Sequence, residues 1–186
     1  VQYSSDLKKR LEDFMDVGTV EERVEFLNNV MEVAVAIELE VAAVYDLFAE
    51  TFAASEELSL FWRLYAETER YHAATIRIHQ TAFVQPEIMA TAMEEEFPTE
   101  FGETREFLAK IRALREGFVE TPPSLEQAFE AAKFLESDAA EVHGRTQFFK
   151  IYPQFHNLFL TLVEEDLGHR KMLVEAQERF AFDITA

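Results

Sequence analysis

An acid–histidine pattern occurs twice in this chain, with nearly the same spacing in each half. Each half has a glutamate, followed after a long interval by an acid-x-x-histidine pair. Residues three apart on a helix project from the same face, so each pair offers a carboxylate and an imidazole to one point. A four-helix bundle builds an interior two-metal site from such a glutamate and such a pair, each used twice. The six residues are Glu38, Glu69 and His72 in the first half, and Glu136, Asp166 and His169 in the second.

The period of apolar residues along the rest of the sequence is that of helices, with few helix breakers. Only 5 Gly and 5 Pro occur among 186 residues, and no alternating strand pattern flanks a hairpin turn. We predict an all-α four-helix bundle of two antiparallel helix pairs, forming a single domain over residues 1–186. The predicted bundle helices cover 20–52, 56–84, 124–150 and 154–181, with a helical crossover connection over 86–123 and a short N-terminal helix over 6–16.

The predicted helix starts carry recognisable capping signals. Thr19 is followed three residues later by Glu22, and Ser124 by Gln127, which are both capping-box patterns. Pro153 marks the turn into the last helix. These signals fix the beginnings of three of the four bundle helices.

The crossover segment contains an amphipathic stretch. Phe107, Ile111, Leu114 and Phe118 fall on one helical face. We interpret this stretch as a helix that covers the bundle, because such a face normally packs on its own core. The alternative is a helix that binds a partner.

Composition excludes several classes of function. The formal net charge is −19, from 17 Lys and Arg against 36 Asp and Glu, which argues against binding to nucleic acid or to anionic lipid. The absence of cysteine excludes disulfides, iron–sulfur clusters and thiol catalysis in this chain. No apolar run is long enough to span a membrane, and we expect a cytoplasmic protein.

Carboxylates and imidazoles without thiolates are the ligands of iron or manganese and are less typical of structural zinc. The simpler interpretation is that these pairs are solvated on helix surfaces, because 36 of the 186 residues are acidic and chance pairs are common. Their position in the middle of long helices and their apolar neighbours favour a buried site. Those neighbours are Phe61, Leu64, Tyr65 and Ile76 near His72, and Leu158, Leu162, Leu167 and Leu173 near His169.

Residues 36–50, together with Ala66-Glu-Thr-Glu-Arg-Tyr-His72, resemble the ferritin-like superfamily and are most similar to its rubrerythrin-like branch. The resemblance covers residues 20–84 and 124–180. It implies a ferritin-like bundle with a non-haem di-iron centre that reacts with oxygen or hydrogen peroxide. The implied cofactor is two iron ions, with manganese or a mixed pair as alternatives. The matching ligand positions are Glu38, Glu69, His72, Glu136 and His169.

The chain departs from the family pattern at several positions, two of which concern candidate ligands. Asp166 stands where the family has a glutamate, and Glu165, four residues before His169, is an alternate ligand on the same helix face. His143 stands where the family usually has a tyrosine. It is an additional ligand, a hydrogen-bond donor to a ligand carboxylate, or a core histidine. Tyr45 lies beside the expected ligands, and we predict a catalytic role for it as a donor of a hydrogen bond or an electron. The alternative is that Tyr45 only stacks on its neighbours.

The resulting hypothesis is a rubrerythrin-like di-iron oxidoreductase of the peroxidase or ferroxidase type, acting in oxidative-stress defence or iron handling. The rubredoxin domain is absent from this chain because it needs cysteines, so the electron donor is unknown. We expect a homodimer that uses oxygen or hydrogen peroxide. The alternatives are an iron-storage protein of the ferritin type, a di-iron substrate oxygenase, and a non-catalytic helical bundle that binds a partner.

Overall fold

The computed structural model describes residues 19–87, 102–146 and 153–183. The described part is all-helical, which confirms the predicted all-α class, and each of the four predicted bundle helices begins within one residue of its expected start. The predicted short helix over 6–16 lies outside the described residues, as do residues 147–152. The helices are α2 (Val20–Thr51), α3 (Glu56–Phe83), α5 (Gly102–Glu120), α6 (Leu125–Thr146) and α7 (Pro153–Asp183).

Both predicted capping boxes are present. The Thr19 side chain accepts a hydrogen bond from the Glu22 backbone N–H at 3.2 Å, and the Glu22 carboxylate accepts one from the Thr19 N–H at 2.7 Å. Ser124 and Gln127 exchange the same two bonds at the start of α6, at 2.8 and 3.2 Å. These bonds satisfy backbone donors that the first turn of a helix leaves without an intrahelical partner.

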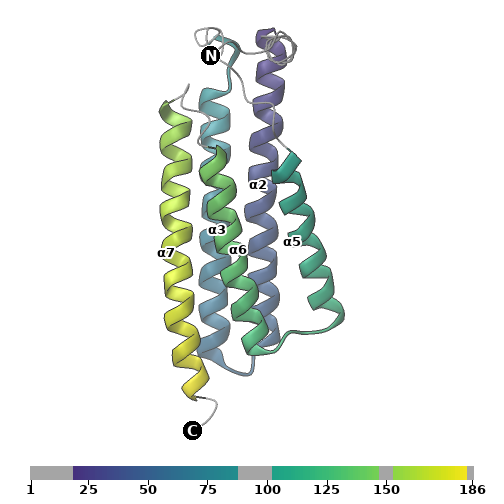
Figure 1. Cartoon of the computed structure of the whole chain (residues 1–186), viewed down its shortest axis with the longest axis vertical. Helices are drawn as coiled ribbons and strands as arrows, with labels where there is room; N and C mark the ends of the chain where they lie inside the picture. The colour runs from purple at the N-terminus through teal and green to yellow at the C-terminus, as the bar shows by residue number, and fades with distance from the viewer. Residues whose placement is uncertain (1–18, 88–101, 147–152, 184–186) are drawn as a thin grey trace, which may run out of the picture.

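The four long helices lie side by side as two antiparallel pairs (Figure 1). Helix α2 pairs with α3 through a tight turn, and α6 pairs with α7. Helix α3 of the first pair also contacts α7 of the second, antiparallel to it. This arrangement brings the two halves of the repeated acid–histidine pattern together.

Helix α5 lies along the outside of α2 (Figure 1). Phe107 and Ile111 are buried, and Leu114 and Phe118 pack against the same apolar cluster. The predicted amphipathic face therefore points into the molecule's own core, as expected for a helix that covers the bundle.

Two arginines tie α5 to α2 beside this apolar contact. Arg112 Nε and Arg115 Nε each lie 3.0 Å from a different carboxylate oxygen of Glu40. Glu40 is two residues from Glu38, so it points away from the face that carries the candidate ligand.

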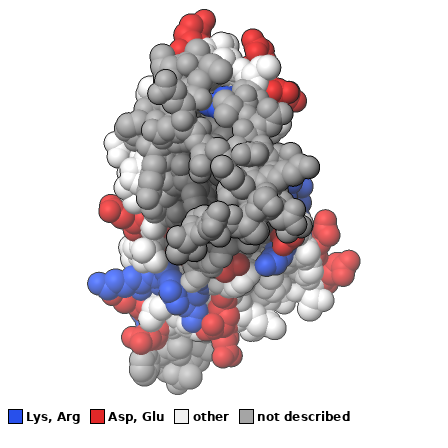
Figure 2. All heavy atoms as spheres, turned by 45° about the horizontal axis from the view of Figure 1, so that its top comes forward, with Lys and Arg blue, Asp and Glu red and all other residues white. Residues whose placement is uncertain are grey.

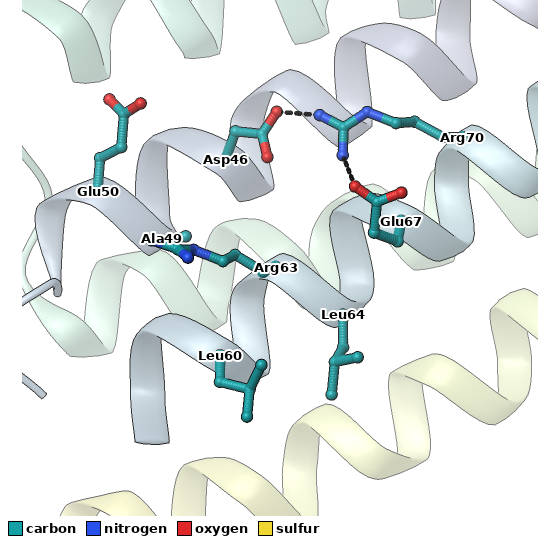
Figure 3. Close-up of a pocket in the computed structure, with 8 residues that line it drawn as sticks. All are labelled: Asp46, Ala49, Glu50, Leu60, Arg63, Leu64, Glu67 and Arg70. Atoms are coloured by element: carbon teal, nitrogen blue, oxygen red, sulfur yellow. Dashed lines mark hydrogen bonds and ion pairs between the residues drawn. The ribbon is translucent and has the colours of Figure 1, made fainter. Parts of the chain in front are cut away.

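The outer surface between α2 and α3 carries a second ionic contact. Arg70 of α3 forms ion pairs with Asp46 of α2 and with Glu67 of its own helix, at one side of a hollow that also contains Leu60 and Leu64 (Figure 3). This hollow is on the outside of the helix pair and includes none of the predicted metal ligands.

Within the described residues, no helix combines the length and apolarity needed to cross a membrane. Acidic side chains lie at several places around the edge of the face shown in Figure 2, and Lys and Arg side chains lie among them. Among the described residues on that face, the acidic side chains do not gather in one patch.

Candidate metal centre

The predicted ligands lie in a polar layer between two apolar clusters of the bundle. Along α2, Leu27, Met31 and Val35 belong to one cluster and Val41 and Phe48 to the other, and Glu38 lies between Val35 and Val41. Along α3, which runs antiparallel to α2, the order of the clusters is reversed, whereas along α7 it is the same as along α2. On both α3 and α7 the acid–histidine pair again falls between the two clusters. The positions of the apolar residues along each helix thus set the level of the bundle at which the polar side chains meet.

Two groups of carboxylate and imidazole atoms form in this layer. Glu38, Glu69 and His72 make the first group, in which His72 Nδ1 lies 3.1 Å from Glu69 Oε2 and 3.5 Å from Glu38 Oε2. Glu69, Glu136 and His169 make the second, in which His169 Nδ1 lies 3.4 Å from Glu136 Oε2 and 3.7 Å from Glu69 Oε1. In each group one ligand atom from every residue lies within 4.8 Å of the others.

Glu69 belongs to both groups and lies between them. Its Oε2 faces His72 and its Oε1 faces His169, so each oxygen of the Glu69 carboxylate lies beside the histidine of a different group. The two imidazole rings are nearly parallel, with ring centroids 5.6 Å apart and an interplanar angle of 17°. This places the two three-residue groups next to each other around a shared carboxylate.

All four carboxylates of the predicted set are inside the molecule. The exposed fraction is 1% for Glu38, 2% for Glu69, 2% for Glu136 and 1% for Asp166. Buried carboxylates are costly unless a positive charge compensates them, because burial removes their hydration. Positive charge at this layer would therefore lower the cost of burying these four carboxylates.

Burial and mutual repulsion act on these acids. The pKa of Glu69 is raised well above its usual value, first by burial and then by the charge of Glu136. The pKa of Glu136 is raised first by burial, with a further contribution from the charge of Asp166. Burial alone would lower the pKa of His72, but hydrogen bonds to and charges on Glu38 and Glu69 outweigh it and raise the pKa to about 11.

Two atoms of the second group are left without a hydrogen bond in the described structure. Glu69 Oε1 and His169 Nδ1 are buried and make no hydrogen bond, although they face each other at 3.7 Å. That separation exceeds hydrogen-bond length. A metal bound by both atoms would satisfy them, and carboxylate with imidazole is a donor set that suits iron or manganese.

The remaining predicted residues take different positions. Asp166 is buried and close enough to Glu136 to raise its pKa, but it is in neither three-residue group. Glu165 has a 42% exposed side chain and lies on the opposite side of His72, with its Oε2 2.9 Å from His72 Nε2. The backbone of His143 is in α6, and its side chain lies outside the described residues.

Two of the apolar neighbours used to predict burial are exposed. Leu64 is 60% exposed and Leu167 is 52% exposed, because each lies on the outward face of its helix. At these two positions, closeness in sequence to a predicted ligand did not indicate a buried side chain. The other apolar neighbours named above are buried or partly buried.

Tyr45 touches the site directly. Its hydroxyl donates a hydrogen bond to Glu136 Oε1 at 2.5 Å. Burial, followed by the charges of Glu136 and Glu69, raises the pKa of Tyr45 well above its usual value, so the phenol keeps its proton. Tyr45 therefore orients a candidate ligand, and its predicted catalytic role stays a prediction.

Tyr65 is a site residue that the sequence predictions did not assign to the site. Its hydroxyl donates to the backbone carbonyl of His169 at 3.2 Å, and its ring centroid lies 5.4 Å from the His169 ring. Tyr65 precedes Glu69 by four residues, so the same helical spacing that groups Glu69 with His72 also places Tyr65 on their face. The four-residue spacing from Glu69 was the sequence signal that could have predicted Tyr65 as a site residue.

Tyr45→Phe is expected to weaken metal binding about 10-fold, because it removes a donor that holds a ligand carboxylate. Metal-free protein should also lose about 1 kcal/mol of unfolding free energy, the usual net value of one hydrogen bond. Isothermal titration with Co²⁺ and denaturant unfolding measure the two effects. The matched control is Tyr71→Phe, since Tyr71 is 66% exposed. Equal affinities of both variants for Co²⁺ would contradict this role of Tyr45.

Comparisons of this chain with protein-family models, with curated proteins and with solved structures find no match. The assignment of a function therefore rests on the site itself.

Proposed function

We propose that this chain is a ferritin-like di-iron protein of the rubrerythrin-like type, which oxidises Fe(II) with hydrogen peroxide or oxygen. The observation that carries the proposal is the shared carboxylate of Glu69, which belongs to both acid–histidine groups. One carboxylate common to two adjacent groups is suited to two metal ions rather than one. The homodimer, the external electron donor and the choice of iron over manganese belong to the same proposal.

The balance of charge supports two divalent cations. Four buried carboxylates carry four negative charges when ionised, and two neutral imidazoles add none. Two divalent cations would neutralise them, whereas a single one would leave two buried negative charges uncompensated. Within the predicted set, Glu38 and His72 would hold one ion, Glu136 and His169 the other, and Glu69 would bind both.

The arrangement of the helices also supports the ferritin-like part of the proposal. Two antiparallel helix pairs each provide a glutamate and a histidine, and a crossover connection containing α5 joins the pairs. In ferritin-like carboxylate proteins, two helices each contribute a glutamate and the other two each contribute an acid-x-x-histidine pair. The described helices follow that distribution, with aspartate in place of glutamate at 166.

A bound iron pair would supply two electrons, which reduce one hydrogen peroxide molecule, together with two protons, to two molecules of water. The chain's own side chains have separate tasks. The apolar clusters on either side exclude water from the layer, and Tyr45 fixes the orientation of Glu136. The His169 side chain is 12% exposed, more than the side chains of the other four residues of the two groups.

The test is an anaerobic titration of metal-stripped protein with Fe(II), followed by addition of hydrogen peroxide. We expect uptake of two Fe(II) per chain and oxidation of both by one equivalent of peroxide. Continued uptake of many irons per chain after repeated oxidation would instead identify a storage protein. Binding of less than one Fe(II) per chain would reject the proposal and leave a helical bundle without this chemistry.

A further inference from the structure

We propose that Glu165 is a positioning residue, which holds the His72 ring with its Nδ1 atom directed at the metal position shared by Glu38 and Glu69. The inference rests on the proposed function and goes beyond it, because it assigns the solvent-side partner of one ligand. It also replaces the expectation that Glu165 is an alternate ligand.

The two nitrogen atoms of His72 have separate surroundings. Nδ1 faces the carboxylates of Glu69 and Glu38, at 3.1 and 3.5 Å. Nε2 points the other way and lies 2.9 Å from Glu165 Oε2. An imidazole that binds a metal through one nitrogen carries its proton on the other, so Nδ1 ligation places the proton on Nε2.

That Nε2 proton needs an acceptor inside the protein. The side chain of His72 has no exposed surface, so bulk solvent does not reach Nε2. The carboxylate of Glu165 lies within reach of Nε2. The contact has the right length but is not aligned as a hydrogen bond, and such bonds commonly tighten when a site is filled.

The position of Glu165 on α7 explains why its carboxylate can reach His72 Nε2. Consecutive residues on a helix differ in direction by 100°, so Asp166 and Glu165 cannot both point inward. Asp166 is 1% exposed and lies in the buried layer, whereas the Glu165 side chain is 42% exposed at its edge. Glu165 therefore reaches from α7 to the His72 ring on α3 while part of its carboxylate stays hydrated.

The two histidines differ in exposure and in the groups around them. The His169 side chain is 12% exposed, and its backbone carbonyl accepts a hydrogen bond from Tyr65. His72 is fully enclosed and has a carboxylate on each side. Glu165 thus makes the two metal positions inequivalent, and its removal should affect the position at Glu38 and His72 more than the other.

The test uses Co²⁺ as the probe, with the full chain and the variants Glu165→Ala, Glu165→Gln and Glu164→Ala. Calorimetry gives the two affinities, and proton NMR of the Co²⁺ form shows the shifted imidazole N–H signals. The His72 signal is the one missing in Glu38→Gln. Glu164→Ala is the matched control, because Glu164 is the exposed neighbour with the same charge.

We expect Glu165→Ala to weaken one of the two Co²⁺ affinities by about 10- to 100-fold and to speed exchange of the His72 N–H with solvent. Glu165→Gln keeps an acceptor oxygen and should restore much of the affinity, and Glu164→Ala should match the wild type. The inference is overturned if Glu165→Ala binds two Co²⁺ with wild-type affinity and slow exchange. It is also overturned if both Glu165 variants lose one Co²⁺ completely, because Glu165 would then be a ligand. Failure of the wild type to bind two Co²⁺ would instead count against the proposed function.

Discussion

Glu69→Gln is expected to abolish tight binding at both metal positions, whereas Glu38→Gln removes only one. Glu69 Oε2 faces His72 and Glu69 Oε1 faces His169, so the neutral amide weakens both groups at once. Glu38 belongs to the first group alone. Loss of a charged partner in a buried site costs about 3–5 kcal/mol, which is more than about 100-fold in affinity.

The measurement is metal content after equilibrium dialysis against Co²⁺ or anaerobic Fe(II). We expect two ions per chain in the wild type, one in Glu38→Gln and fewer than one in Glu69→Gln. Glu67→Gln is the matched control, since Glu67 is on the same helix and its side chain is 71% exposed. If Glu69→Gln kept one ion bound with undiminished affinity, the shared role of Glu69 would be wrong.

Metal-free protein is expected to lose stability as the pH rises from 6.5 towards 9. The pKa of His72 is raised from 6.5 to about 11, so its contribution is complete below pH 6.5 and is lost as the pH rises through about 11. The raised pKa values of Glu69 and Glu136 act in the same direction, because the folded state binds protons that the unfolded state releases. For each extra proton that the folded state holds, the unfolding free energy falls by about 1.4 kcal/mol for every unit rise in pH.

Denaturant unfolding of metal-stripped protein at several pH values measures this slope. Metal binding should reverse it, because the ligands release protons when they bind cations, so the apparent affinity for Co²⁺ should rise with pH. Glu69→Gln removes one carboxyl group whose pKa is raised and one carboxylate partner of His72. The unfolding free energy of its metal-free form should therefore fall less steeply as the pH rises. A metal-free wild type whose stability is independent of pH between 6.5 and 9 would show that the buried layer holds no extra protons.

The sequence alone determined the helices and most of the residues that gather in the candidate site. Helix starts followed from local signals, such as the capping boxes at Thr19 and Ser124, which depend only on residues three apart. The inward direction of Glu69 and His72 followed from the helical period and from the apolar residues on the same face. Such local relations survive in any fold that keeps the helices, which is why they could be predicted.

Only the tertiary structure decided how the helices meet and what each acid contacts. The relative shift of α3 and α7 is set by packing between residues distant in sequence, and it brings Glu69 between the two histidines. The same packing separates Asp166 in the buried layer from Glu165 at its edge, although the two are neighbours in the chain. A 100° step along one helix is known from sequence, but which side faces α3 depends on the neighbouring helix.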